Sequence, residues 1–200
     1  MKVTNAAFQR LGFVLRNAAP LTAAATQALY GALVRSILET NAVVWSPHED
    51  KYILMLEQVQ KRFLRYLYKK NHVYYPFMYP TRFLEGHLGY NSIELRRNLA
   101  LVKFILNIIR NKIDCMDLVE KTIKLFVPDR YLRARSHKLF AVPPSRTNLY
   151  RCSPVARALH LLGSLLAEAP ECDVFVDRMS SLMNVCKGML ERSMKVSAIC

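Results

Sequence analysis

The stretch ALYGALVRSILETNAVVWSP (residues 28–47), followed by EQVQKRFLRY (residues 57–66), predicts two helices joined by a short connector. Leu29, Leu33 and Ile37 recur every fourth residue, so they would line one face of the first helix. The second segment combines apolar and basic residues at helical spacing. A helix with one buried face and one cationic face can pack on a core and also contact a phosphate backbone. The stretch therefore predicts a helical fold and gives a first indication that the chain binds nucleic acid.

The rest of the chain also favours helices, and we expect a mainly α fold built as a helical bundle. Capping residues such as Thr22, Thr81 and Ser92, together with prolines and glycines, set the predicted bounds. Gly86 is predicted to end the helix that Thr81 begins. Within the helix at 49–70, the predicted apolar stripe is Ile53, Leu56, Gln60, Phe63 and Leu67. The predicted helices are 4–15, 22–41, 49–70, 81–85, 92–111, 114–124, 154–167 and 173–191.

Several segments resemble the region after the polymerase palm in jockey-type, LINE-like reverse transcriptases of insect non-LTR retrotransposons. The resemblance implies a thumb domain and carboxy-terminal extension of an RNA-directed DNA polymerase, which hold the template–primer duplex. It also implies that this chain is a fragment of a transposable-element enzyme without the catalytic palm. RNA or an RNA–DNA duplex and the upstream palm would then be its partners. The segments that carry the resemblance are LVRSILE (33–39), VVWSP (43–47), QVQKRFLRY (58–66), LGYNSIELRRNLALVKFILNIIRNKID (88–114) and LFVPDRYLRARSHKLFAVPPSRTNLYRCSPVARALHLLGSLL (125–166).

A change in composition predicts three parts. Residues 1–126 would form the helical, thumb-like bundle, and residues 153–200 a carboxy-terminal helical appendage containing a helical pair. Between them, residues 127–152 are rich in arginine and proline and lack a sustained helical period. This linker would be an irregular, basic, extended arm, and short strands around 138–142 are an equal alternative.

The charge balance favours a polyanionic partner. Lys and Arg number 29 against 15 Asp and Glu, which gives a formal net charge of +14. Nucleic acid and an acidic membrane surface both suit such an excess. Two alternatives stay open: a basic helical module that binds acidic proteins or membrane surfaces, and a protein whose charges serve only solubility. Hydrophobic residues make up 52% of the chain, which argues against disorder.

The sequence lacks the residues that polymerase chemistry needs. A polymerase holds two metal ions with clustered carboxylates, because the metals neutralise charge on the transferring phosphate. The chain has no Asp-Asp pair, and its adjacent acids Glu49 and Asp50 are explained by placement at a helix start. No Gly-rich phosphate loop, HExxH or GxSxG motif is present. We therefore expect no enzymatic activity from this chain alone.

Cysteine usage and hydropathy predict an intracellular protein, nuclear or cytoplasmic, with no metal and no cofactor. An odd number of scattered cysteines without a CxxC motif is typical of reduced thiols. Residues 1–19 are predicted to be structural and not a targeting peptide. The longest apolar run, residues 99–109, is shorter than the ~20 residues of a membrane span, so no span is expected. The cysteines are Cys115, Cys152, Cys172, Cys186 and Cys200.

Candidate nucleic-acid contacts are the basic residues of the two long helices and of the arm. On the helix at 92–111 the cations recur every seven residues, which predicts one basic ridge. Contacts of this kind go to phosphates, so they position the ligand without reading its sequence. The predicted residues are Lys61, Arg62, Arg65, Lys69, Lys70, Arg96, Lys103, Arg110, Arg133 and Arg135.

An aromatic segment follows the basic helix. Tyr74, Tyr75 and Tyr79 lie in an irregular stretch beside cations, so they are candidates for stacking on bases. Rings folded back onto the bundle are an equal alternative. The single tryptophan, Trp45, is better explained as a core anchor between two helices. His72 and His87 are isolated in the sequence and are predicted to be surface or capping residues.

Overall fold

The computed structural model describes residues 2–72, 74, 78–127, 139–142 and 144–196. It is 69% helical and 2% strand, which confirms the prediction of a mainly α fold. The chain forms two compact units, Met1–Arg97 and Asn98–Cys200. The division predicted from composition, at residues 126 and 152, stays a prediction.

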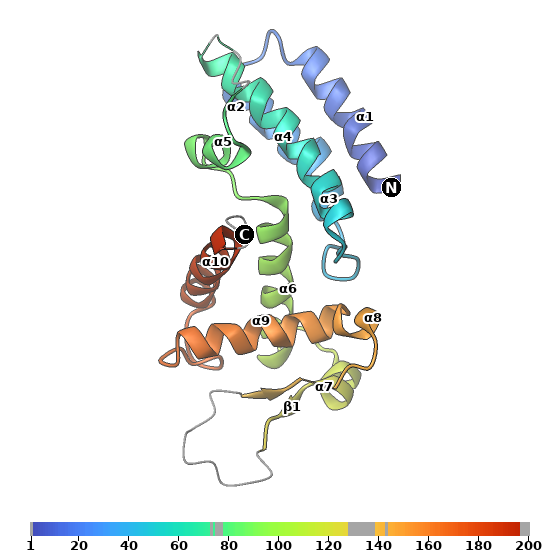
Figure 1. The fold of residues 1–200 in the computed structure, drawn as a ribbon, viewed down its shortest axis with the longest axis vertical. Helices are drawn as coiled ribbons and strands as arrows, with labels where there is room; N and C mark the ends of the chain where they lie inside the picture. The colour runs from blue at the N-terminus through green and yellow to red at the C-terminus, as the bar shows by residue number, and fades with distance from the viewer. Residues whose placement is uncertain (1, 73, 75–77, 128–138, 143, 197–200) are drawn as a thin grey trace. The chain divides into compact units, whose positions relative to one another are not determined.

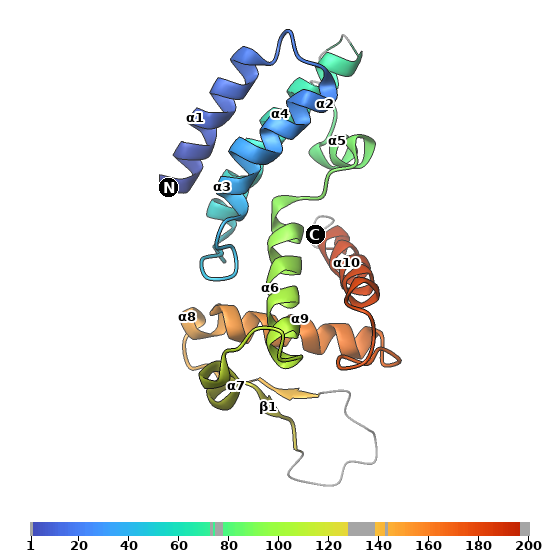
Figure 2. The ribbon, with the colours of Figure 1, turned by 180° about the vertical axis from the view of Figure 1, so that it is seen from behind.

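In the described residues of the first unit, every regular element is a helix (Figures 1 and 2). In both views α1 lies beside α4, and the contacts between these two helices are among the most extensive in the chain. The elements are α1 (Lys2–Asn17), α2 (Ala23–Tyr30), the π-helical turn η1 (Gly31–Arg35), α3 (Ser36–Glu39), α4 (Asp50–His72), α5 (Thr81–Leu88) and the start of α6 (Ile93–Ile109).

The helix predicted at residues 22–41 exists as the continuous run α2–η1–α3. Its start is capped as expected, because the Thr22 hydroxyl accepts a hydrogen bond from Ala25 N at 3.2 Å. A single π turn then interrupts the α-helical spacing before α3 resumes it. The run ends at Glu39 with Thr40 as its C-cap, and the next residue, Asn41, has a left-handed φ of 54°. Asparagine tolerates this conformation better than most residues, so it suits a helix end.

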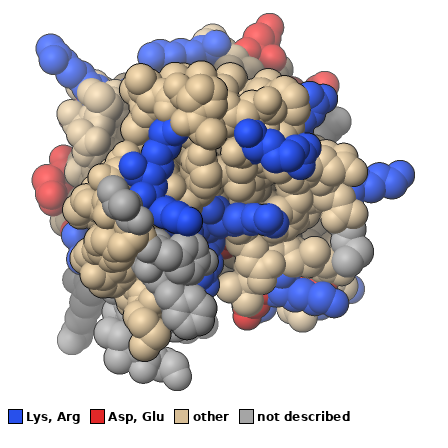
Figure 3. Space-filling model, turned by 90° about the horizontal axis from the view of Figure 1, so that it is seen from above, with Lys and Arg blue, Asp and Glu red and all other residues tan. Residues whose placement is uncertain are grey.

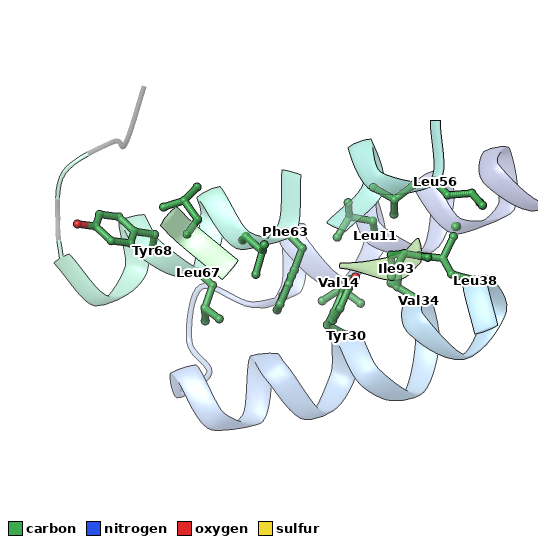
Figure 4. Packing of buried hydrophobic residues seen from close by; sticks show 14 residues of the cluster. Leu11, Val14, Tyr30, Val34, Leu38, Leu56, Phe63, Leu67, Tyr68 and Ile93 are labelled. Carbon is green, nitrogen blue, oxygen red and sulfur yellow. The ribbon is translucent and has the colours of Figure 1, made fainter. Parts of the chain in front are cut away.

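The buried row of this helical run differs from the predicted one. Leu29, Leu33 and Ile37 are only partly buried and flank the core, whereas the fully buried row lies one position further along the chain. Tyr30 decides this, because its ring stacks on Phe63 of α4 with centroids 3.8 Å apart and planes 5° from parallel. Burying the stacked pair turns the tyrosine row inward (Figure 4). That row is Tyr30, Val34 and Leu38.

Helix α4 has the two-sided character that its sequence predicts. Ile53 is only partly buried at the start of the helix, and the other four residues of the predicted stripe are buried. The polar member, Gln60, donates hydrogen bonds to Asn91 O at 2.9 Å and to a Glu85 carboxylate oxygen at 3.3 Å. These bonds explain how an amide is tolerated in the core. The buried side is completed by Leu56, Val59, Phe63, Leu64, Leu67 and Tyr68.

A buried arginine fastens the connector between α3 and α4 to the start of α6. Arg97 is 3% exposed, and its guanidinium donates hydrogen bonds to the backbone carbonyls of Leu38 and Trp45 and to the Ser46 hydroxyl. The same group lies over the Trp45 ring, 4.0 Å from its centroid. A cation is favourable here because Leu38 is in the last turn of α3, where the helix dipole is negative. Trp45 is therefore a core anchor, as predicted, although its ring is only partly buried.

A partly buried carboxylate holds the other side of the α6 N-terminus. Glu57 of α4 accepts a hydrogen bond from Glu94 N at 2.8 Å, and Ser92 caps Leu95 N at 3.2 Å, as its sequence position predicts. Burial raises the pKa of Glu57 to about 7, although the hydrogen bonds from the Glu94 and Ile93 amides act in the opposite direction.

Two predicted helix bounds are corrected. Helix α5 runs through Gly86 and ends at Leu88, because its C-cap Gly89 has the left-handed φ of 70° that lets Tyr90 N bond to Glu85 O. Helix α10 (Met179–Val196) begins six residues later than expected. Asp173 accepts hydrogen bonds from Phe175 N and Val176 N, so its side chain forms a turn where a helix start was predicted.

The second unit combines helices with a small hairpin. After the rest of α6 come α7 (Met116–Thr122), β1 (Lys124–Leu125), β2 (Phe140–Ala141), α8 (Asn148–Arg151), α9 (Pro154–Glu168) and α10. The strands pair antiparallel, with Leu125 opposite Phe140, so the strand alternative is correct for residues 140–141. Helices α9 and α10 contact each other and form the predicted carboxy-terminal pair. Among the described helices, none is both long and apolar enough to span a membrane.

Candidate nucleic-acid interface

The second half of α4 is the most concentrated cationic segment among the predicted contacts. Residues 61–72 contain five cations and neither Asp nor Glu. Opposite the buried stripe, the side chains of Arg62 and Lys69 are exposed, and those of Lys61 and Arg65 are partly buried. The four lie within two turns of one helix, so a phosphate backbone could contact several of them together. We call Lys61, Arg62, Arg65 and Lys69 the basic face of α4.

No acidic residue lies among the cations of the basic face in the sequence. Ion pairs elsewhere in the described residues include Arg35 and Arg96 with Glu39, Lys187 with Glu191, and Arg192 with Glu168. Figure 3 shows a face of the protein on which Lys and Arg side chains are numerous and Asp and Glu side chains are few and lie toward its edges. Such a distribution attracts polyanions from a distance at low ionic strength.

Lys70 has a structural contact that its sequence position does not reveal. Its ammonium donates hydrogen bonds to Ala18 O at 2.6 Å and to Ala19 O at 3.3 Å. These carbonyls directly follow the last residue of α1, so the lysine satisfies acceptors and complements the negative end of that helix. This side chain holds α1 against the end of α4 and has less of its charge available for a phosphate.

The predicted basic ridge of α6 is not a single surface. Arg96 forms a two-pronged ion pair with Glu39, and this bond raises the pKa of the arginine. Arg110 follows the end of α6 and donates from Nε to Val174 O at 2.7 Å within the second unit. Lys103 is exposed. Two of the three cations therefore have intramolecular partners, which explains their spacing without a ligand.

The predicted residues Arg133, Arg135 and Tyr75 lie outside the described residues. Their proposed contacts stay predictions. Among the described candidates, Lys61, Arg62, Arg65 and Lys69 lie together on one side of α4.

The remaining stacking candidates belong to a cluster of rings. Tyr74 is 48% exposed and Tyr79 is 36% exposed, and their hydroxyls lie 3.2 Å apart. The Tyr74 ring meets the Tyr68 ring edge-on, and the Tyr79 ring stacks on Phe83 at 4.8 Å. These contacts already use much of each ring, so the alternative of rings packed on the bundle explains them. Base stacking on Tyr74 and Tyr79 stays a prediction.

Sequence reasoning missed a pair of histidines in the same cluster. His72, the last residue of α4, and His87 of α5 are exposed, as predicted, but they are not isolated. Their Nε2 atoms lie 3.0 Å apart. Fifteen residues separate the two in the chain, so only the turn between α4 and α5 could have indicated the contact.

The described residues contain no cluster that suits polymerase chemistry. No group of three or more His, Cys, Asp or Glu side chains there is placed to hold a metal ion. Asp114, just before α7, and Asp117, in its first turn, are exposed. Among the cysteines, Cys186 is buried, and burial raises the pKa of its thiol to about 11, which makes it unreactive.

No protein-family model, curated protein or solved structure matches this chain.

Proposed function

We propose that this chain binds RNA or an RNA–DNA duplex through the basic face of α4. One observation carries the proposal: four cations, with no acidic residue among them, line the side of α4 opposite its buried stripe. The core fixes the rotation of this helix, so the cations are held on one side before any ligand binds. Phosphate contacts from such a surface would position a duplex without reading its sequence.

The resemblance to the region after the palm in jockey-type reverse transcriptases supports this proposal from a second direction. A thumb needs a rigid helix that presents cations to the template–primer duplex, and α4 fits that requirement. In this reading the chain is a thumb and carboxy-terminal fragment of a non-LTR retrotransposon RNA-directed DNA polymerase. It would work beside a palm and would be inactive alone.

Duplex affinity is expected to fall about 100-fold between 50 and 200 mM salt, because about four neutralised phosphates release their counterions. Fluorescence anisotropy with a labelled RNA–DNA duplex at several salt concentrations measures this slope. Duplexes of unrelated sequence should give the same values. A flat salt dependence would contradict the proposal. Equal affinity for anionic lipid vesicles would favour the membrane-surface alternative.

Replacing Arg62 and Lys69 together with alanine is expected to weaken duplex binding about tenfold and to reduce the salt slope by about two. Both side chains are exposed, so the variant should unfold at nearly the wild-type denaturant concentration. The matched control replaces Lys112 and Arg178, two exposed cations of the second unit, and removes the same charge. If both double variants lose affinity equally, only net charge matters and α4 is not the binding site.

The purified chain is expected to show no primer extension with magnesium or manganese on any template. In-line attack on a triphosphate needs metals held by convergent carboxylates, and the described acids do not converge. Incorporation of labelled nucleotide, measured on denaturing gels, checks this expectation. Incorporation that disappears when Asp114 or Asp117 is replaced by asparagine would overturn it.

A further inference from the structure

The histidine pair between α4 and α5 is held by neighbouring rings. The Tyr68 ring lies 4.4 Å from the His72 ring and 5.4 Å from the His87 ring, measured between centroids. Phe83 stacks on His87 at 5.8 Å with planes 12° from parallel. Tyr68 is buried, so its ring contacts link both imidazoles to the core of the first unit. The two Nε2 atoms therefore face each other before any ligand arrives.

We propose that His72 and His87 bind a divalent transition-metal ion of the zinc type through their Nε2 atoms. Zinc–imidazole bonds are about 2.0–2.1 Å long, so two nitrogens on a tetrahedral ion lie about 3.4 Å apart. The observed separation is 3.0 Å. Small rotations of two exposed side chains provide the difference. Both residues are accessible to solvent, so water molecules can fill the remaining positions on the ion.

The proton balance of this step is simple. In the pair without metal, one neutral imidazole donates from Nε2 and the other accepts. Metal binding needs both Nε2 lone pairs, so the donating ring moves its proton to Nδ1 through solvent. No net proton is released from two neutral rings. The ion replaces a hydrogen bond between α4 and α5 with two coordinate bonds, so it should stabilise the first unit.

The two imidazole ligands favour one class of metal ion. Imidazole suits zinc, copper and nickel, whereas magnesium and calcium prefer oxygen ligands. Its geometry does not depend on the basic face of α4, so the site and the proposed nucleic-acid binding can succeed or fail separately.

The test uses the full chain without an affinity tag and zinc chloride as the probe. Trp45 is the only tryptophan and lies in the first unit, whereas the five cysteines all lie beyond residue 97. Its fluorescence therefore reports unfolding of the unit that contains the histidine pair. We expect zinc to raise the urea midpoint of the Trp45 transition, because a ligand that binds only the folded state stabilises it. Calcium should leave that midpoint unchanged.

Variants His72→Gln and His87→Gln keep a hydrogen-bonding side chain but remove an imidazole ligand. Each is expected to lower zinc affinity at least ~10-fold, because the second ligand acts within the same molecule. His160→Gln, an exposed histidine of α9, is the matched control and should bind as the wild type does. Midpoints in EDTA show whether each variant is folded. The proposal is overturned if millimolar zinc does not raise the wild-type midpoint, or if the double variant His72→Gln/His87→Gln responds as the wild type does.

Discussion

Arg97→Ala is expected to lower the free energy of unfolding of the first unit by about 2–6 kcal/mol. The guanidinium is 3% exposed and contacts two backbone carbonyls, the Ser46 hydroxyl and the Trp45 ring. Alanine leaves the carbonyls of Leu38 and Trp45 without this donor inside the protein, and each such loss costs about 1–3 kcal/mol. The connector between α3 and α4 would also lose its attachment to α6.

Urea unfolding followed by Trp45 fluorescence measures this change. The control is Arg96→Ala, which removes the same kind of side chain from the next residue. Arg96 has 28% of its side chain exposed and bonds to Glu39, which is 29% exposed. Its loss should cost about 1 kcal/mol, as for ion pairs near the surface. Equal losses from the two variants would mean that Arg97 is not the anchor of the connector.

Glu57→Gln is expected to stabilise the first unit at pH 8, by up to about 3 kcal/mol, and to change little at pH 4. The pKa of Glu57 is about 7 in the folded protein and 4.5 for an ordinary glutamate, mainly because of burial. The folded state thus binds more protons than the unfolded state between these values. Wild-type stability therefore falls as the pH rises from 4.5 to 7, and the full cost is present above pH 7. Glutamine removes the charge and keeps an acceptor for Glu94 N.

The measurement compares wild type and variant by urea unfolding at pH 4 and pH 8. Glu85 and Glu94 are the neighbouring acids that oppose ionisation of Glu57, and both are unchanged in the variant. The control is Glu49→Gln, at an exposed acid before α4. The change in free energy of unfolding that this substitution causes should be the same at both pH values. An equal effect of Glu57→Gln at both pH values would show that the buried charge is not the cause.

Local signals in the sequence predicted the helices well. Thr22 and Ser92 cap the helices that they were expected to begin, because a cap depends on residues within one turn. The separation of apolar and basic sides on α4 is also correct, since helical spacing alone determines it. The aromatic connector with Trp45 as an anchor follows from the same local reasoning.

Partner choice over long distances could not be predicted in this way. Lys70 and Lys69 are adjacent lysines, yet only Lys70 is shown bonding to the carbonyls after α1. Arg96 and Arg97 are equally similar in sequence, but one pairs with Glu39 and the other is buried beside Trp45. Tertiary packing makes these distinctions. Gly86 and Gly89 differ only in backbone conformation, so composition could not show which one ends α5.

The predicted nucleic-acid contacts stay a prediction, and the structure shows how their surroundings differ. Periodicity placed Arg96, Lys103 and Arg110 on a ridge, but spacing cannot tell an exposed cation from one with an intramolecular acceptor. On the basic face of α4, Arg62 and Lys69 are exposed, and Lys61 and Arg65 are partly buried. The identity of the ligand depends on the resemblance and on charge, and it stays a proposal.

The boundary between the two compact units falls inside α6, and this position restricts how the gene can be cut for expression. A fragment that stops at Arg97 would keep only the first turn of α6, and the carbonyls of that turn would lack helical hydrogen-bond partners beside the buried arginine. A fragment that continues to Asn111 would keep the helix but carry Leu101, Val102 and Ile105 into solvent, and these are buried in the intact chain. A surface of that kind promotes aggregation. Crystallisation and binding assays should therefore start from the undivided chain.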